Sequence, residues 1–310
     1  MLLDLRPLTL GELLDRSFSL YRHHFWLFVG IMALPSLLGL SFGLLVALFS
    51  PQPVSPESVE QVNPAEILGA VLWFGAVAIG MLAVYFVTYA VALGATTVAV
   101  SQLYTGRSTS IREAYVPLKG RVGRLAWLLL LVSVRLIGIV LFIVILIGFA
   151  GGLAAVGFPV IAGIAIFVAA IASAFLWVWL LLRYAVCVPA VVLEDATATA
   201  ALRRSVQLTR GSLLRVFALM AFAMIITYAV LAVFQGPFLV VGAMAGPESS
   251  TFFWMNLLGT ITGSVGGAFT APLMIVAFAV LYYDLRVRHE GLDLQLMLAG
   301  LEAPVGPAQV

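Results

Sequence analysis

Three ionisable side chains lie in or beside long apolar runs, where a charge is costly unless it is paired or reaches water. Arg135 lies inside the third apolar run, Arg183 near the end of the fourth, and Asp284 near the end of the sixth. We identify these residues as a candidate intramembrane polar site. Two interpretations of Arg135 stay open. In the first, its guanidinium has a purely structural role, because it pairs with another group of the protein or extends to the membrane surface. In the second, it lines a polar cavity.

Basic residues also occur in short segments that run directly into apolar runs. In 10–25, the apolar side chains follow one helical face and most charged side chains follow another, a pattern typical of a helix in the headgroup layer. Each cation beside an anionic leaflet contributes about 1 kcal/mol. These cations either set topology and anchor the bundle, or bind an anionic lipid headgroup or an acidic partner. The candidate contacts are Arg16, Arg22, Arg121, Arg124, Arg204 and Arg210.

No residue pattern predicts catalysis. His23, His24 and His289 have no metal-ligand partner at helical spacing, and the sequence lacks H-E-x-x-H, G-x-S-x-G and a Walker loop. Glu194 and Asp195 are adjacent, and adjacent residues of a helix do not face each other. The basic residues are spread over several links, which argues against nucleic-acid binding. We therefore expect no catalytic residue, no cofactor and no metal.

The composition indicates a membrane protein. Of 310 residues, 63% are hydrophobic and 10% are charged, and the mean hydropathy is +1.14. A soluble domain carries about 25% charged residues, so the apolar runs are better explained by a lipid bilayer than by a soluble core. The single cysteine, Cys187, excludes an internal disulfide.

Six apolar runs are long enough to cross a bilayer as helices, which takes about 20 residues each. The fourth run continues to Leu193, which is too long for one straight crossing, and we expect Pro189 to mark the end of its spanning part. The predicted fold is therefore all-α, a polytopic bundle of six transmembrane helices. The spans are predicted near 25–49, 67–93, 125–150, 158–184, 214–240 and 254–282.

The links between these spans differ sharply in charge. Segment 50–66 contains three glutamates and no Lys or Arg, 148–158 has no charge, and 241–253 has only Glu248. The other links and the two termini carry 14 of the 16 basic residues. By the positive-inside rule, we predict a multi-pass protein of the inner membrane with both termini in the cytoplasm.

The chain carries traces of a threefold internal repeat. Residues 16–22 match 204–210 at Arg, Ser, Leu and Arg, and the same offset aligns Thr9 with Thr197, each a predicted helix N-cap. Ser110, with a glutamate three residues later, is a weaker middle copy of the capping box that begins at Thr9.

Endings of the paired spans also resemble one another. A-V-V-L-E-D at 190–195 is similar to A-V-L-Y-Y-D at 279–284, and residues 99–102 show a weaker similarity to both. We predict three tandem parallel units, each a basic amphipathic helix followed by a transmembrane hairpin. The units cover 9–103, 108–193 and 196–284 of a single transmembrane domain, 1–298, and 299–310 forms a flexible tail.

Glycines recur at a spacing that favours close helix packing. Gly259, Gly263 and Gly267 form a doubled G-x-x-x-G in the sixth span. Without side chains, helix backbones can approach closely, and packing replaces the hydrophobic drive that lipid does not supply. We expect these glycines to pack within the chain rather than between two copies.

Two segments carry a family resemblance. They are the stretch V-P-A-V-V-L-E-D-A-T-A-T-A-A-L-R-R-S-V-Q-L-T-R-G and the ending P-L-M-I-V-A-F-A-V-L-Y-Y-D-L-R-V-R-H-E-G-L-D-L. With the opening L-G-E-L-L-D-R-S-F-S-L-Y-R-H-H-F, they resemble the membrane domain attached to some glycerophosphoryl diester phosphodiesterases. In those enzymes the chemistry belongs to a separate soluble barrel, for which this chain has no segment of sufficient length. The resemblance therefore implies no phosphodiesterase activity here.

Taken together, these features predict a non-catalytic integral membrane protein. We expect a scaffold, accessory or stress-related factor whose cytoplasmic basic helices contact the bilayer, through anionic lipid headgroups, or a membrane or cytoplasmic protein partner. A transporter or exporter of a small or amphipathic solute is the alternative, motivated by Arg135 and by the polar half of the second span. An integral-membrane lipid enzyme is a weaker alternative, because it would need clustered carboxylates that the sequence does not predict.

Overall fold

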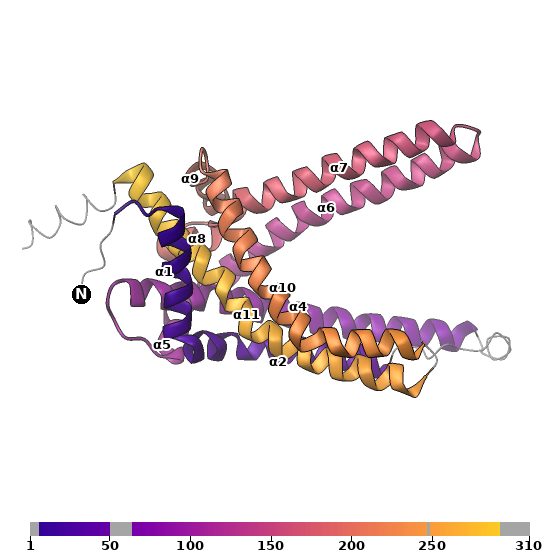
Figure 1. Ribbon diagram of the computed structural model, residues 1–310, viewed down its shortest axis with the longest axis horizontal. Helices are drawn as coiled ribbons and strands as arrows, with labels where there is room; N and C mark the ends of the chain where they lie inside the picture. Colours follow the sequence, from indigo (N-terminus) through magenta and orange to yellow (C-terminus); the bar gives the residue numbers. More distant parts are fainter. Residues whose placement is uncertain (1–5, 50–63, 247–248, 292–310) are drawn as a thin grey trace, which may run out of the picture.

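A computed structural model describes residues 6–49, 64–246 and 249–291, in which all regular structure is helical (Figure 1). This confirms the predicted all-α class. The helices are α1 (Leu10–His23), α2 (Phe25–Phe49), α4 (Pro64–Tyr104), α5 (Ile111–Tyr115), the 3-10 turn η1 (Val116–Leu118), α6 (Val122–Ala155), α7 (Pro159–Tyr184), α8 (Cys187–Leu193), α9 (Ala198–Leu208), α10 (Leu213–Ala245) and α11 (Ser250–Glu290). The predicted 299–310 tail lies outside the described residues.

Six helices within the described residues are long and apolar enough to cross a membrane, as predicted: α2, α4, α6, α7, α10 and α11. Several run further than the predicted spans. The 41 residues of α4 extend over about 60 Å, twice the hydrocarbon thickness of a bilayer. In its polar lower part the buried Thr96 and Thr97 hydroxyls donate to the carbonyls of Ala92 and Leu93, one turn earlier, and are thereby satisfied within the helix.

Helix α7 matches the predicted span 158–184, and the break in the helix comes a few residues before Pro189, which was expected to mark it. Helix α7 stops at Tyr184, a two-residue turn follows, and α8 begins at Cys187. Pro189 explains the position of the break, because a proline ring collides with the carbonyl four residues before it, here Ala185. The proline itself lies in the first turn of α8, where its missing N–H is not needed.

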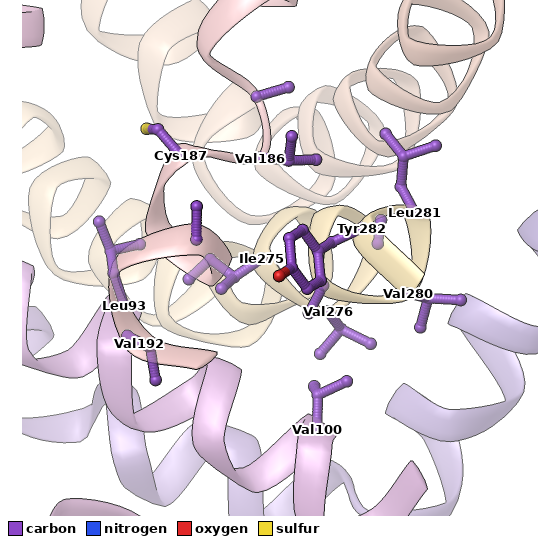
Figure 2. Close-up of a cluster of buried hydrophobic side chains, with 14 of the residues drawn as sticks. Leu93, Val100, Val186, Cys187, Val192, Ile275, Val276, Val280, Leu281 and Tyr282 are labelled. Carbon is purple, nitrogen blue, oxygen red and sulfur yellow. The ribbon is translucent and has the colours of Figure 1, made fainter. Parts of the chain in front are cut away.

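The hydrophobic core gathers at one end of the molecule, where the C-terminal half of α11 meets segments distant in sequence. Figure 2 shows Tyr282 of α11 among side chains of α4 and α8, including Leu93 and Val192. Tyr282 and Leu285 are fully buried, and α1, α9 and the start of α10 cover the same part of α11. We call the core residues of α11, α4, α8, α9 and α1 the hub.

Two groups of helices extend from the hub in different directions. The hairpin α6–α7 forms one arm, and α2, α4, α10 and α11 form the other (Figure 1). Away from the hub, most large apolar side chains on α6 and α7 are exposed, among them Phe142, Ile145 and Phe167. Such surfaces are compatible with lipid, because lipid tails are as apolar as the side chains they would touch.

The predicted N-caps are confirmed. Thr9 and Ser110 each form a capping box with the glutamate three residues on, and Thr197 accepts a hydrogen bond from the backbone N–H of Ala200.

The first capping box also affects the ionisation of its glutamate. The Thr9 N–H and the nearby Arg6 lower the pKa of the Glu12 carboxyl to about 2. The middle helix, α5, is only five residues long because the chain continues as a 3-10 turn that contains proline.

Three glycines of α11 lie against α10, in a register that differs from the predicted one. A Cβ at Gly263 would lie 3.0 Å from Gln235 of α10, and a Cβ at Gly259 or Gly266 would lie 3.3–3.4 Å from Phe238 or Phe234. A Cβ at Gly267 would meet nothing within 4 Å. At about 100° per residue, position i+7 stays on the facing side whereas i+8 turns away, so Gly266 takes the place predicted for Gly267.

Candidate functional site at the basic end

The predicted contact residues lie at the hub end of the molecule, in segments 6–24, 94–124, 183–215 and 279–291, which we call the basic end. Four of the six candidate cations are already held by groups of the same chain. The Arg16 guanidinium donates to the Tyr104 hydroxyl at 3.0 Å and lies 5.6 Å from the centre of its ring. Arg121 and Arg124 each form an ion pair of 2.9 Å with Asp195.

Arg204, the fourth of these cations, belongs to a dense network. Its Nε and Nη2 donate to both oxygens of Glu194 at 2.9–3.0 Å, and Nη2 also pairs with Glu290. The Tyr282 hydroxyl donates to Glu194 at 2.5 Å. Burial alone would raise the pKa of the Glu194 carboxyl, but the hydrogen bonds from Arg204 and Tyr282 hold this pKa below its usual value. A guanidinium bound on two sides has little capacity left for a lipid phosphate.

Asp284 is the most buried carboxylate of the basic end, with a side chain that is 0% exposed. It accepts from the Leu8 N–H at 2.8 Å, from Arg215 Nη1 at 2.7 Å and from Arg288 Nε at 3.1 Å. Both arginines also donate to the Leu8 carbonyl. The network therefore fastens the chain before α1 onto α10 and α11.

The same kind of contact closes the hairpins. Arg124 is the third residue of α6 and pairs with Asp195 after α8, and Arg215 is the third residue of α10 and pairs with Asp284. In the predicted repeat, Asp195 and Asp284 align with Tyr104, which receives Arg16. An arginine thus meets each of the three aligned positions. Only the Arg124 and Arg215 contacts are equivalent, because Arg16 lies in α1 and aligns with Arg204 in the repeat. The tandem-unit hypothesis remains a prediction.

Two of the six candidate cations, Arg22 and Arg210, are exposed and form no ion pair within the described residues. Four other cations of the basic end, which were not among the six candidates, are likewise exposed and form no ion pair within the described residues. They are Arg107, Arg112, Lys119 and Arg203. The sequence shows which residues are basic, but it does not show which of them have a carboxylate within reach.

The residues of the candidate intramembrane site are not brought together. Asp284 is occupied by Arg215 and Arg288, as described above. Arg183 donates to the Val206 carbonyl at 3.1 Å and lies over the Trp179 ring, while its buried Nε has no partner in the described structure. It serves to join α7 to α9, since its own carbonyl accepts from Ser205.

Arg135 is exposed and forms contacts within the hairpin α6–α7, and both interpretations of it remain predictions. Its Nη1 donates to the Leu131 carbonyl at 3.0 Å, and its guanidinium carbon lies 5.8 Å from the centre of the Tyr184 ring. The same residue lines a cavity of about 340 Å³ between α6 and α7, together with Ser173 and several apolar side chains. In the part of the chain that the structure describes, it has no carboxylate partner.

The site contains residues that sequence reasoning missed. Tyr104, Tyr282 and Glu290 each bind a basic side chain or its carboxylate partner. Of these three residues, only Tyr282 belonged to a pattern noted in the sequence, the repeated ending A-V-L-Y-Y-D. Among the described residues, no group of three or more His, Cys, Asp or Glu could hold a metal ion.

Comparison with known proteins gives a family and no function. No curated protein and no solved structure matches the chain. The resemblance to the membrane domain of glycerophosphoryl diester phosphodiesterases therefore remains a prediction. One family model, described as a domain of unknown function (DUF7847), matches residues 26–285 and thus covers four of the six spans completely and most of the first and the last. The chain is a multi-pass membrane protein that belongs to this family.

Proposed function

We propose that the protein is a non-catalytic membrane scaffold or accessory factor that binds anionic lipid headgroups through its basic end. The observation that carries this proposal is the set of exposed cations without an internal carboxylate. A cation engaged by a buried carboxylate stabilises the fold, whereas an exposed and unpaired cation remains available to a phosphate outside the protein. The available cations are Arg22, Arg107, Arg112, Lys119, Arg203 and Arg210.

Exposed aromatic side chains support a membrane surface close to these cations. Trp26 is 75% exposed at the start of α2, and Trp127 is 54% exposed near the start of α6. Tryptophan favours the boundary between lipid and water, because its ring is apolar and its N–H is polar. Trp26 follows Arg22 by four residues, across the turn at His24 that separates α1 from α2, so the two side chains are close along the chain.

The energy of this interaction is modest for each residue and depends on salt. A cation beside an anionic leaflet contributes about 1 kcal/mol, and the attraction falls off over about 8 Å at physiological ionic strength. Several cations acting together would select anionic over neutral lipid by tenfold or more. An acidic protein partner would use the same cations, and the test below separates the two ligands.

The experiment measures lipid selectivity in reconstituted membranes. Spin-labelled phosphatidylglycerol and phosphatidylcholine report the fraction of each lipid that the protein immobilises. We expect a preference for phosphatidylglycerol that falls several-fold when Arg22, Arg112, Arg203 and Arg210 are all replaced by glutamine. Replacement of the same four residues by lysine keeps the charge and is the matched control. Equal selectivity in the glutamine and wild-type proteins would refute lipid binding and would favour a protein partner.

A transporter is the second candidate, and Arg135 favours it. An unpaired guanidinium lining a cavity of about 340 Å³ between two spans would attract an anionic or amphipathic solute. The test is solute flux in proteoliposomes with wild-type protein and with Arg135→Ala and Arg135→Lys. Flux that is lost in the alanine variant and largely kept in the lysine variant would support transport. No flux of any anionic amphiphile tested would remove this candidate.

A further inference from the structure

Two cavities follow one another along the seam between α2 and α4. The first, of about 370 Å³, lies among α2, α4 and α11 and is lined in part by hydroxyl-bearing side chains: Ser36, Tyr85, Tyr89 and Ser264. The second, of about 220 Å³, continues along the same two helices and is lined only by apolar side chains, among them Phe42, Trp73 and Phe74. We call them the polar cavity and the apolar cavity.

The polar cavity contains donors that the protein does not use. Tyr85 and Tyr89 stack with ring centres 5.8 Å apart, and within the described residues neither hydroxyl has a hydrogen-bond partner. By contrast, the Tyr115 hydroxyl donates to the Ile31 carbonyl at 2.7 Å, and the Tyr21 hydroxyl donates to the Phe269 carbonyl. Neither hydroxyl oxygen of Tyr85 or Tyr89 is among the fully buried polar atoms that lack a partner, so both are accessible from the cavity and free to donate to a group bound there.

Prolines in two of the lining helices each leave one carbonyl without its usual helical N–H donor. Pro35 in α2 and Pro272 in α11 lack the N–H that would bind the carbonyl four residues earlier. For Pro35 this carbonyl is that of Ile31, which receives the Tyr115 hydroxyl instead. For Pro272 it is the carbonyl of Ala268, a residue that lines the polar cavity.

Small residues make room for a ligand. A Cβ at Gly267 would meet nothing within 4 Å, although Gly267 borders the polar cavity. A Cβ at Gly39 would lie 3.3 Å from the Tyr85 ring, so this glycine allows the phenol to turn into the space. Together the two cavities reach the volume of a small-molecule site, which is about 300–1,000 Å³.

Depth and charge restrict the kind of ligand. Pro35 lies ten residues into α2, about 15 Å along the helix and near the middle of a hydrocarbon layer about 30 Å thick. No Asp, Glu, Lys, Arg or His is among the residues that line either cavity. A phosphate headgroup at this depth would be strongly unfavourable without a countercharge, whereas a carbonyl or hydroxyl group would be satisfied by the two phenols.

We propose that the two cavities form one binding site for an amphiphile with an uncharged hydrogen-bonding head and an apolar chain. The head accepts hydrogen bonds from Tyr85 and Tyr89 in the polar cavity, and the chain follows α2 and α4 into the apolar cavity. A quinone head and a diacylglycerol head share this chemistry. The site is separate from the basic end and does not depend on the function proposed there.

The test measures equilibrium binding to the purified full-length protein in detergent. The probes are radiolabelled decylubiquinone, dioleoylglycerol and, as the charged comparison, dioleoyl phosphatidylglycerol. The double variant Tyr85→Phe with Tyr89→Phe keeps both rings and removes only the hydroxyls. The variant Gly267→Leu fills the polar cavity. Tyr228→Phe on α10 and Gly80→Leu on α4 make the same changes at exposed positions and serve as matched controls.

We expect saturable binding of at least one neutral probe, with one molecule bound per chain. Two lost hydrogen bonds of about 0.5–1.5 kcal/mol each correspond to binding weakened about 5- to 100-fold in the double phenylalanine variant. Gly267→Leu should abolish binding, and both controls should bind like wild type. Preference for the quinone would identify a carbonyl head, and preference for the diacylglycerol a glycerol head.

Three outcomes would overturn the proposal: no saturable binding of either neutral probe, an unchanged Kd in the double phenylalanine variant, or equal affinity for phosphatidylglycerol. Gel filtration and thermal unfolding establish that each variant is folded. The glutamine variants of the basic end should bind the neutral probe like wild type, so failure of one proposal leaves the other intact.

Discussion

Replacement of Asp284 by asparagine is the most direct test of how the hub is held together. The carboxylate is fully buried and accepts hydrogen bonds from the Leu8 N–H, Arg215 and Arg288. Asparagine has nearly the same shape, so Asp284→Asn creates no cavity. It removes the negative charge and leaves two guanidinium groups close together without a counterion.

The expected loss follows from these contacts. A hydrogen bond to a charged group contributes about 1.5–3 kcal/mol, so three such bonds set an upper bound near 9 kcal/mol. The side chains of Arg215 and Arg288 are 21% and 31% exposed, so both regain water when the carboxylate is lost. Asparagine also keeps one acceptor oxygen. We therefore expect a destabilisation of about 2–4 kcal/mol, in the range for a broken, partly buried ion pair.

The single cysteine provides the assay. Cys187 is 5% exposed and belongs to the hub, so a maleimide dye reacts with it only when the hub opens. In a thermal scan of detergent-purified protein, a loss of 2–4 kcal/mol should lower the temperature of dye reaction by about 5–10 °C. In the double variant with Arg215→Gln, the loss should be smaller than the sum of the two single losses, because the two residues share one contact.

The control is Asp15→Asn, which removes an exposed carboxylate of α1 that forms no ion pair among the described residues. It should leave the transition within about 1 °C of wild type. If Asp284→Asn behaved like this control, or if its effect were additive with that of Arg215→Gln, the clamp between the N-terminal segment and the last helix would contribute little. The central role given to the hub would then be wrong.

Two further predictions concern the same framework. Because the pKa of Glu194 is lowered in the folded protein, its contribution to stability is complete above its unfolded value of about 4.5 and is lost as the pH falls through the folded value. The unfolding temperature should therefore drop below about pH 4.5, and this part of the drop should vanish in Glu194→Gln. Gly263→Leu places a side chain against Gln235 and should destabilise by about 1–3 kcal/mol, whereas Gly80→Leu, in open space, should not. Dye reaction at Cys187 reports both.

The arrangement of a packed hub with two diverging arms has a consequence for the bilayer. Both arms expose apolar side chains along most of their length, while the hub carries nearly all the ion pairs. Lipid therefore completes the packing of the arms, and the protein alone completes that of the hub. Truncations of core side chains in the hub should be more harmful than changes of lipid-facing residues on α6 or α7.

Local features of the fold were predictable because they depend on neighbouring residues. Hydropathy over about 20 residues identified the six spans, and side chains three residues apart identified the caps at Thr9, Ser110 and Thr197. The predicted fourth span, 158–184, ends where α7 ends, and the break precedes Pro189 by a few residues because a proline disrupts the turn before it. The charge of each link was also read correctly, although orientation in the membrane remains a prediction.

The candidate site was predictable only in part, because it depends on which distant segments meet. Arg124 and Arg204 looked as available as Arg210 in the sequence, but folding brings Asp195 and Glu194 within reach of the first two. Similarly, the position of Arg135 inside an apolar run was visible in the sequence, whereas no sequence pattern marked the unpartnered hydroxyls of Tyr85 and Tyr89.

The sequence by itself determined that this chain is an all-helical membrane protein with its cations on one set of links, since hydrophobicity and helix capping act over a few turns. Only the tertiary structure decided which cations are neutralised, which glycines touch a neighbouring helix and where cavities remain. Those outcomes depend on the meeting of segments far apart in the sequence, such as Leu8 and Asp284, which are separated by 276 residues, and no local pattern encodes such a meeting.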